Sequence, residues 1–281
     1  MTAPDEPEVD LATEDPPRME LVRHSLRVRV LEVREVQRPT RRLVRVALGG
    51  DELAGFASDG PADHVKVFLP PPGGRDPIVP TLGPDGIVPT DGPRPVGRDY
   101  TPRHHRLDEG LLELDFVLHD GGRASAWAAE VGVGDPLAVG GPRGSHVPAG
   151  RIEGLVLLAD ETGLPAVHNW LRWAPAGLPV TARLEVQDEA EIQPLETVAD
   201  LDERWLLRGR DAPGRSNVLV DAVDDLPLRS GGTLCWVAAE TGVVAAVRSR
   251  LLGRHGVHPD RVHARGYWKL GDAGHEVPHS D

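Results

Sequence analysis

The stretch Gly154-Leu155-Val156-Leu157-Leu158-Ala159-Asp160-Glu161-Thr162-Gly163 decides the fold of the second half of this 281-residue chain. Its first six residues form a continuous apolar run, which is typical of a strand buried on both faces of a parallel sheet. Asp160 and Thr162 favour helix N-termini, and a helix is expected at residues 165–173. A buried strand that passes directly into a helix is the repeating unit of an α/β fold.

The same alternation continues towards the C-terminus. Strands are expected at residues 180–186, 205–207, 233–238 and 262–267, and helices at residues 217–223 and 243–252. This order predicts a doubly wound parallel sheet. The order Ala, Glu, Thr, Gly occurs at both strand ends, in residues 159–163 and in Ala239-Glu240-Thr241-Gly242. Such sheets bind ligands outside the carboxyl ends of their strands, so the repeated order could mark a ligand site. The alternative is that it marks two turns with good N-capping residues.

The first half of the chain has a different pattern. Runs with strand character at residues 26–32, 42–48 and 64–69 are bounded by glycine or proline clusters, and further strands are expected at 98–103, 111–119 and 136–139. A short helix is expected at residues 123–131, and residues 70–97 are read as a long loop. This half therefore predicts an antiparallel β-barrel. The expected organisation is a disordered acidic tail (1–22), the barrel (23–149), the α/β domain (150–273) and a second tail (274–281).

Within the barrel half, Arg98-Asp99-Tyr100-Thr101-Pro102-Arg103 places two guanidiniums, a phenol and a hydroxyl in six residues. A guanidinium can bind phosphate through a fork of donors. The ring of Tyr100 can lie against a flat ring system, and Thr101 can offer it one hydrogen bond. The motif therefore suits a planar anionic ligand, and the alternative is an ordinary strand with solvated charges.

Composition excludes several classes of protein. The net charge of −13 argues against a general nucleic-acid binder. A single cysteine, Cys235, excludes an intrachain disulfide and a four-cysteine metal site, and its apolar neighbours indicate a buried, inert thiol. No metal site is predicted. No stretch approaches the roughly 18 apolar residues of a membrane span, and the N-terminus lacks the features of a secretory signal, so the cytoplasm is expected.

Several motifs together resemble the siderophore-interacting proteins, FAD-dependent ferric-siderophore reductases of the ferredoxin-reductase superfamily. The motifs that carry the resemblance are Arg98 to Arg103, Asp115-Phe116-Val117-Leu118-His119, Gly122 to Ala128, Gly134-Asp135, Gly141-Pro142-Arg143-Gly144, Asp160 to Ala166, Glu240, and Gly266-Tyr267-Trp268. The chain departs from the family pattern at Gly163, where many relatives have alanine, and at Ala239, where many have glycine.

The resemblance implies that Arg98 holds the FAD pyrophosphate, that Tyr100 stacks on the isoalloxazine, and that Thr101 hydrogen-bonds near flavin N5. The residues at the start of the expected helix, Ala124 and Ser125, would contact phosphate, since a helix N-terminus presents unpaired N–H groups. Two further cofactor contacts, Arg103 and His119, have structural alternatives: Arg103 could pair with Asp99 or Asp115.

The resemblance also implies a nicotinamide nucleotide at the second domain. Asp160, Glu161 and Thr162 take the place of the glycine-rich turn, and Glu240 would lie near the nicotinamide. Arg208 could bind a 2′-phosphate, which favours NADPH slightly, whereas acidic residues after the preceding strand suit NADH.

The expected activity is reduction of a ferric siderophore by NAD(P)H through FAD, with release of Fe(II). Tyr100, Thr101 and Glu240 are the expected catalytic residues. The anionic substrate is expected to contact Lys66, Arg265 and Lys269. The alternatives are a flavin reductase that serves a protein electron carrier and a non-catalytic siderophore-binding iron carrier. The oligomeric state is left open, with a monomer as the working expectation.

Overall fold

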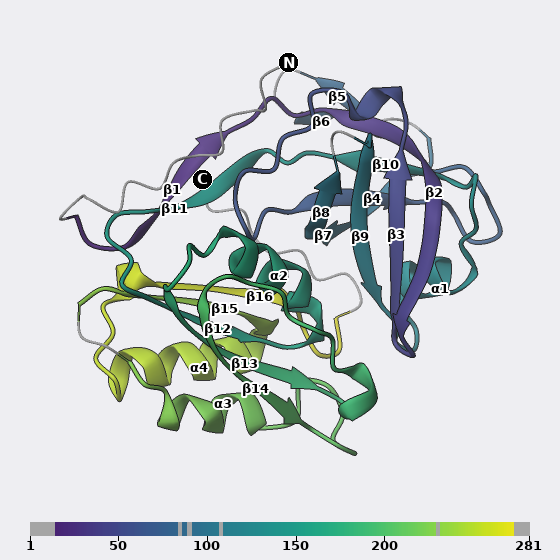
Figure 1. The fold of residues 1–281 in the computed structure, drawn as a ribbon. Coiled ribbons are helices and arrows are strands. Elements are labelled where there is room, and N and C mark those ends of the chain that lie inside the picture. Colours follow the sequence, from purple (N-terminus) through teal and green to yellow (C-terminus); the bar gives the residue numbers. More distant parts are fainter. Residues whose placement is uncertain (1–14, 84–85, 89–91, 107–108, 229–230, 273–281) are drawn as a thin grey trace.

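A computed structural model describes residues 15–83, 86–88, 92–106, 109–228 and 231–272. The chain forms a β-barrel followed by an α/β domain, with a two-stranded ribbon beside them (Figure 1). Both sheets agree with the fold class expected from the sequence. Among the described residues, no helix is long and apolar enough to span a membrane.

The barrel is a seven-stranded antiparallel sheet. In sheet order its strands are β7 (Val96–Tyr100), β4 (Val65–Leu69), β10 (Pro136–Gly140), β2 (Val28–Thr40), β3 (Leu43–Gly49), β9 (Leu111–Val117) and β8 (Pro102–Arg106). The two edge strands, β7 and β8, are separated in the chain by Thr101 alone. The sheet must therefore curl until its edges meet. Alternate side chains of these strands fill the interior, including Val65, Val67 and Phe116, and helix α1 (Arg123–Glu130) packs against the same core.

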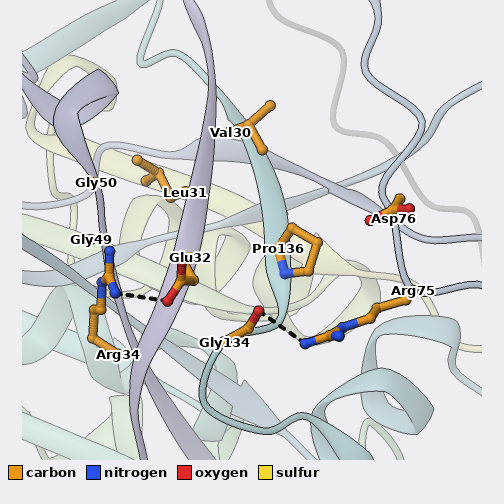
Figure 2. A pocket seen from close by; sticks show the side chains of 10 residues that line it. All are labelled: Val30, Leu31, Glu32, Arg34, Gly49, Gly50, Arg75, Asp76, Gly134 and Pro136. Atoms are coloured by element: carbon orange, nitrogen blue, oxygen red, sulfur yellow. Dashed lines mark hydrogen bonds and ion pairs between the residues drawn. The ribbon is translucent and has the colours of Figure 1, made fainter.

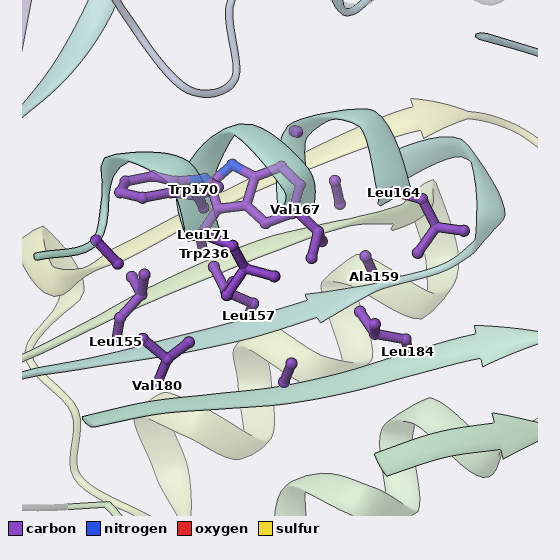
Figure 3. Close-up of a cluster of buried hydrophobic side chains, with 14 of the residues drawn as sticks. Leu155, Leu157, Ala159, Leu164, Val167, Trp170, Leu171, Val180, Leu184 and Trp236 are labelled. Atoms are coloured by element: carbon purple, nitrogen blue, oxygen red, sulfur yellow. The ribbon is translucent and has the colours of Figure 1, made fainter. Parts of the chain in front are cut away.

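The second domain is a five-stranded parallel sheet. Its strands in sheet order are β14 (Asp200–Leu207), β13 (Pro179–Val186), β12 (Gly154–Ala159), β15 (Thr233–Glu240) and β16 (Val262–Trp268). Every residue of β12 and β15 is buried, as their continuous apolar runs predict. Helix α2 (Leu164–Trp173) covers one face, where Trp170 and Trp236 pack together (Figure 3). Helices α3 (Val218–Asp221) and α4 (Thr241–Gly253) cover the other face.

Four strands lie where no strand was expected. β1 (Arg18–Arg23) pairs with β11 (Gly144–Ala149), so ordered structure begins inside the segment interpreted as a tail. A small hairpin, β5 (Thr81–Gly83) and β6 (Gly86–Val88), interrupts the loop expected at residues 70–97. The pair of β1 and β11 forms between segments far apart in the chain, and the local periodicity of a sequence does not reveal such pairing. The remaining tail residues, 1–14 and 273–281, lie outside the described residues.

Polar contacts join the two domains at several places. The Asn169 side chain on α2 donates to the carbonyl oxygens of Pro102 on β8 (2.7 Å) and Pro61 (3.0 Å). At the turn between β2 and β3, the Thr40 hydroxyl donates to Glu191 of the second domain. Arg41 at the same turn donates to both carboxylate oxygens of Asp188, at 3.0 and 2.9 Å. These contacts fix the barrel against the parallel sheet.

Candidate flavin and nucleotide site

The register between β4 and β7 sets the faces of the barrel motif. Asp99 lies opposite Lys66, and the two side chains form an ion pair at 3.0 Å. Tyr100 lies opposite Val65 and points to the other face, as strand alternation requires. Its half-buried ring packs on Phe116 at a centroid distance of 4.4 Å. Burial raises the pKa of Tyr100, which therefore stays a neutral phenol.

The two arginines of the motif have different environments. One, Arg98, donates to the adjacent carbonyl oxygen of Gly97 at 2.6 Å and is half-buried. The other, Arg103, lies 3.6 Å from the carboxylate of Asp115, which Arg45 also binds at 2.7 and 2.9 Å. Of the two carboxylates considered for Arg103, the structure pairs it with Asp115. Its role as a cofactor contact stays a prediction.

Thr101 connects the barrel to the second domain. The residue is 6% exposed, and its hydroxyl lies 3.4 Å from the Tyr267 hydroxyl on β16. Burial raises the pKa of Tyr267 to about 12, so this phenol is also neutral. The predicted flavin-contacting threonine therefore lies where the two domains touch.

The N-terminus of α1 has no side-chain cap, and Gly122 at the N-cap position is extended. The first helical hydrogen bond runs from the Ala126 N–H to the Gly122 carbonyl oxygen, so the N–H groups of the preceding turn have no acceptor within the helix. Ser125, predicted as an extra hydroxyl donor to phosphate, uses its hydroxyl locally. It donates to the His119 carbonyl oxygen and accepts from the His119 N–H, both at 2.8 Å.

His119 is held in the turn that precedes α1. A Cβ added to Gly122 would lie 2.4 Å from Cε1 of the exposed His119 ring, so the ring would have to move for any residue larger than glycine. The ring nitrogen Nδ1 lies 3.2 Å from the Asp120 carbonyl oxygen. This arrangement places the backbone N–H groups of Ala124 and Ser125, rather than the serine hydroxyl, as the donors left for a phosphate.

In the second domain, the carboxylate of Asp160 organises the end of the sheet. One oxygen accepts from the N–H and hydroxyl of Thr162, at 2.9 and 2.5 Å. The other accepts from the Glu240 N–H at 3.1 Å and the Trp268 indole at 2.8 Å. Burial raises the pKa of Asp160, and the Thr162 and Trp268 donors together with the charge of Arg208 oppose that shift. Asp160 thus joins the ends of β12, β15 and β16, at the point where the strand order reverses.

Glu240 and Arg208 are also committed to contacts within the protein. One oxygen of Glu240 caps α4 by accepting from the Gly242 and Val243 N–H groups, and the other accepts from the Leu270 N–H at 3.1 Å. The Arg208 side chain is 3% exposed and lies 2.5 Å from Glu161 and 3.8 Å from Glu185.

Burial of this cluster also affects its carboxylates. It raises the pKa of Glu161, and it raises the pKa of Glu185 to about 7. A 2′-phosphate could reach the Arg208 guanidinium only if this cluster rearranged. Binding of phosphate by Arg208 and a direct part for Glu240 in catalysis both stay predictions.

The three residues predicted to bind substrate are arranged differently. Lys66 is paired with Asp99, as described above, and Lys269 is exposed just beyond β16. Arg265 on β16 lies with one guanidinium nitrogen 3.3 Å from Nε2 of His146 on β11. Sequence reasoning missed His263, which lies two residues before Arg265 on β16, and His146, which only the approach of β11 to β16 brings beside them. Cys235 is fully buried, and burial raises the pKa of its thiol to about 12, as expected for an inert residue.

An open pocket of about 430 Å³ lies elsewhere on the barrel (Figure 2). Its lining residues are Val30, Leu31, Glu32, Arg34, Gly49, Gly50, Arg75, Asp76, Gly134 and Pro136. None of the predicted site residues is among them. Its two arginines are already engaged, Arg34 with Glu32 at 2.7 Å and Arg75 with the Gly134 carbonyl oxygen at 3.1 Å. Nothing about this pocket indicates a ligand.

Comparison with known proteins agrees with this geometry. Residues 32–146 match the siderophore-interacting FAD-binding domain, and residues 152–271 match the siderophore-interacting protein domain. An NADPH-dependent ferric-chelate reductase of Escherichia coli is 36% identical over 88% of this chain and 95% of its own length. The chain belongs to the siderophore-interacting protein family.

Two further relatives support the assignment. The ferric vibriobactin reductase ViuB of Vibrio cholerae is 29% identical over 85% of this chain and 90% of its own. The crystal structure of a siderophore utilization protein from T. fusca has a TM-score of 0.86 and 37% identity, covering 92% of this chain and 98% of the other. The family resemblance and the ferredoxin-reductase-like fold expected from the sequence are therefore confirmed.

The barrel is an FAD-binding domain, and its residues fit that cofactor. Tyr100 offers a half-buried flat ring, and α1 offers an N-terminus without a side-chain cap. Thr101 offers a hydroxyl at the domain junction, where its contact with Tyr267 is long, at 3.4 Å. FAD is a flat ring system joined to phosphates, so Tyr100 and Thr101 suit its ring and the α1 N-terminus suits its phosphates.

Proposed function

We propose that the protein is an FAD-containing reductase that takes electrons from a nicotinamide nucleotide and reduces the iron of a ferric siderophore to Fe(II). The observation that carries the proposal is the contact between Thr101 of the barrel and Tyr267 of the α/β domain. It brings the flavin-binding motif to the strand that carries Arg265. The relatives from Escherichia coli and Vibrio cholerae are named for activities of this kind.

Bound FAD supplies the redox chemistry, accepting a hydride and passing on single electrons. The chain's own residues place and shield it. Tyr100, packed on Phe116, would hold the ring system, and Arg98 with the α1 N-terminus would neutralise the phosphates. Thr101 presents its hydroxyl at the junction, and Tyr267 closes the space from the other domain. Glu240 acts here by fixing α4 and the end of β15.

The substrate side of the proposal rests on charge. Hard oxygen ligands favour Fe(III), so reduction loosens the iron from the chelator. Ferric chelates with catecholate or carboxylate oxygens carry negative charge, and Arg265 and Lys269 provide positive charge on and just beyond β16. The proposed compartment is the cytoplasm, where nicotinamide nucleotides are available. The protein is proposed to act as a monomer, with the barrel at residues 23–149 and the nucleotide domain at 150–273.

The test starts from the purified protein loaded with FAD under anaerobic conditions. NADPH or NADH should bleach the flavin absorbance. Addition of a ferric siderophore should then restore it, with one Fe(II) trapped by a colorimetric chelator for each electron. Failure to bind FAD at all would sink the proposal. Equal rates with a protein electron carrier and no preference for ferric siderophores would favour the flavin-reductase alternative, and no bleaching with either nucleotide would leave only a binding role.

A further inference from the structure

One face of β16 carries a row of three polar side chains, His263, Arg265 and Tyr267, spaced two residues apart. All three are half-buried. Val262 and Ala264 point to the opposite face, where they join the core beneath α3 and α4. At one end of the row the Tyr267 hydroxyl meets Thr101. The row therefore leads away from the flavin-binding motif along the side of the sheet that faces the barrel.

His146 on β11 completes this row from the ribbon. The centroid of its ring lies 5.3 Å from that of His263, with the ring planes inclined by 48°. Its Nε2 is 3.3 Å from a guanidinium nitrogen of Arg265. Because a guanidinium can only donate, Nε2 must offer a lone pair, and the neutral His146 carries its proton on Nδ1. The pair therefore stands as two neutral imidazoles beside a fixed cation.

The charges around the pair are mostly positive. Arg265 lies on β16. On β1, Leu21 lies opposite His146, and Arg23 lies two residues further along on the same face of the strand. Two carboxylates lie in the loop before β4: Asp63 accepts the Ser145 hydroxyl at 2.5 Å, and Asp59 donates its backbone N–H to the same hydroxyl at 3.1 Å. Neither His146 nor His263 forms an ion pair with a carboxylate of the described residues, whereas the nearby His24 lies 3.6 Å from Asp59.

These surroundings disfavour imidazolium in the free protein. Burial together with Arg265 lowers the pKa of His146, and burial lowers the pKa of His263 to about 4. Burial raises the pKa of Asp63 to about 7, so this carboxyl is itself largely neutral in weak acid. The site thus has one guanidinium, two neutral rings and no carboxylate paired with either ring. An incoming anion would supply the missing charge.

We propose that His146, His263 and Arg265 form a proton-linked docking site for an anionic ferric chelate, in which binding is accompanied by uptake of a proton from solvent by the imidazole pair. The inference rests on the proposed reductase function and names the charge class of its substrate. A negative charge within a few ångströms favours the protonated imidazole, and by linkage the protonated pair binds the anion more tightly. Arg265 anchors the chelate at any pH, and the imidazoles make the affinity pH-dependent.

The test uses the full-length protein with FAD and the gallium(III) complex of a hexadentate tris-catecholate, a redox-inert trianion. Its affinity should rise as the pH falls from 8 to 6, by up to about tenfold per pH unit for one linked proton. Calorimetry in two buffers of different ionisation enthalpy should show net proton uptake on binding. The neutral gallium complex of a trihydroxamate should bind without this slope.

The matched variants are His146→Gln with His263→Gln, and His258→Gln as a control on an exposed imidazole outside the row. The double variant should lose the pH slope, while the control keeps it. Each single variant should reduce the slope, and thermal unfolding checks that the folds are intact. A trianion affinity that is independent of pH in the unmodified protein, or a slope that survives in the folded double variant, overturns the inference. Either result leaves the proposed function standing if the flavin still passes electrons to ferric chelates.

Discussion

The barrel mouth (Arg98, Tyr100 and Thr101) and the sheet edge, by which we mean the carboxyl ends of the parallel strands (Asp160, Glu161, Glu185, Arg208 and Glu240), both lie where a cofactor is expected. They differ in whether their side chains are already bound to other groups of the protein. At the sheet edge, the carboxylates and the guanidinium are engaged with one another or with backbone N–H groups. At the barrel mouth, Tyr100 keeps part of its ring exposed, and Thr101 has a long contact of 3.4 Å.

This difference separates two ways in which a strand end can serve a ligand. The barrel mouth offers its side chains directly, so the residue types themselves indicate the ligand. The sheet edge uses its side chains to hold three strand ends and a helix in place. A nucleotide bound there would therefore contact mainly backbone atoms. Substitutions at the mouth should change cofactor affinity, whereas substitutions at the edge should first change stability.

The largest effect is expected for Asp160→Ala. The substitution leaves the Glu240 N–H and the Trp268 indole without their acceptor. Each buried donor left unpaired costs about 1–3 kcal/mol, so the second domain should lose roughly 3 kcal/mol or more. Urea unfolding followed by tryptophan fluorescence measures this, since Trp170 and Trp236 lie in that core. Asp160→Asn, which keeps one acceptor oxygen, should lose less. Equal stability of Asp160→Ala and the unmodified protein would show that the edge is not held in this way.

At the barrel mouth, Arg98→Ala should weaken FAD binding without unfolding the barrel. Hydrogen bonds to charged groups contribute about 1.5–3 kcal/mol, which corresponds to a loss of roughly 10- to 150-fold in affinity. Fluorescence titration of the apoprotein with FAD gives the dissociation constant. Arg94→Ala is the matched control, because Arg94 is an exposed arginine just before β7. Comparable losses in the two variants would assign the effect to general charge rather than to the Arg98 position.

The third prediction concerns the pH dependence of the sheet edge. Burial raises the pKa of Glu185 to about 7, above its value in the unfolded chain, so the folded state holds this proton more tightly. Its contribution to stability is full below the unfolded pKa and is lost as the pH rises through about 7. Glu185→Gln imitates the protonated form and removes this loss. Relative to the unmodified protein, the variant should gain about 2 kcal/mol between pH 5 and pH 8.

Urea unfolding at several pH values between 5 and 8 checks this prediction. A residual slope is expected in the variant because burial also raises the pKa of Glu161 and Asp160. Identical slopes for the two proteins would mean that Glu185 titrates like an exposed carboxylate.

Much of the fold follows from local patterns in the chain. The apolar runs of β12 and β15 identify buried strands, and the alternation in β4 identifies a strand with two faces. The strand β14 shows the limit of this approach. Only its apolar end at residues 205–207 was expected, because Asp200 to Arg204 are polar apart from Leu201 and lie on the outer strand of the sheet. An edge strand can be polar on both sides, so periodicity does not reveal it.

Contacts between residues close in the sequence could be predicted from it, and contacts that cross the chain could not. The motif around Tyr100 carries its ligand chemistry within six residues. Arg208, by contrast, pairs with Glu161, 47 positions earlier, and becomes buried by doing so. The ion pair of Arg103 with Asp115 depends on the neighbouring strands β8 and β9. His146 and His263 come together only because β11 passes beside β16.

The smallest effect is expected for Gly163→Ala, which restores the residue that the resemblance leads one to expect. In this chain the added Cβ would lie 2.8 Å from the Ala159 Cβ and 3.0 Å from the Ala238 carbonyl oxygen. Both neighbours belong to central strands and cannot move without disturbing the sheet. Overpacking of this kind costs about 1–3 kcal/mol. Gly253→Ala is the matched control, since an added Cβ there meets nothing within 4 Å. If Gly163→Ala were as stable as Gly253→Ala, the turn after β12 would be more adaptable than its hydrogen bonds to Asp160 indicate. The sheet edge would then resemble the barrel mouth in having room to adjust to its ligand.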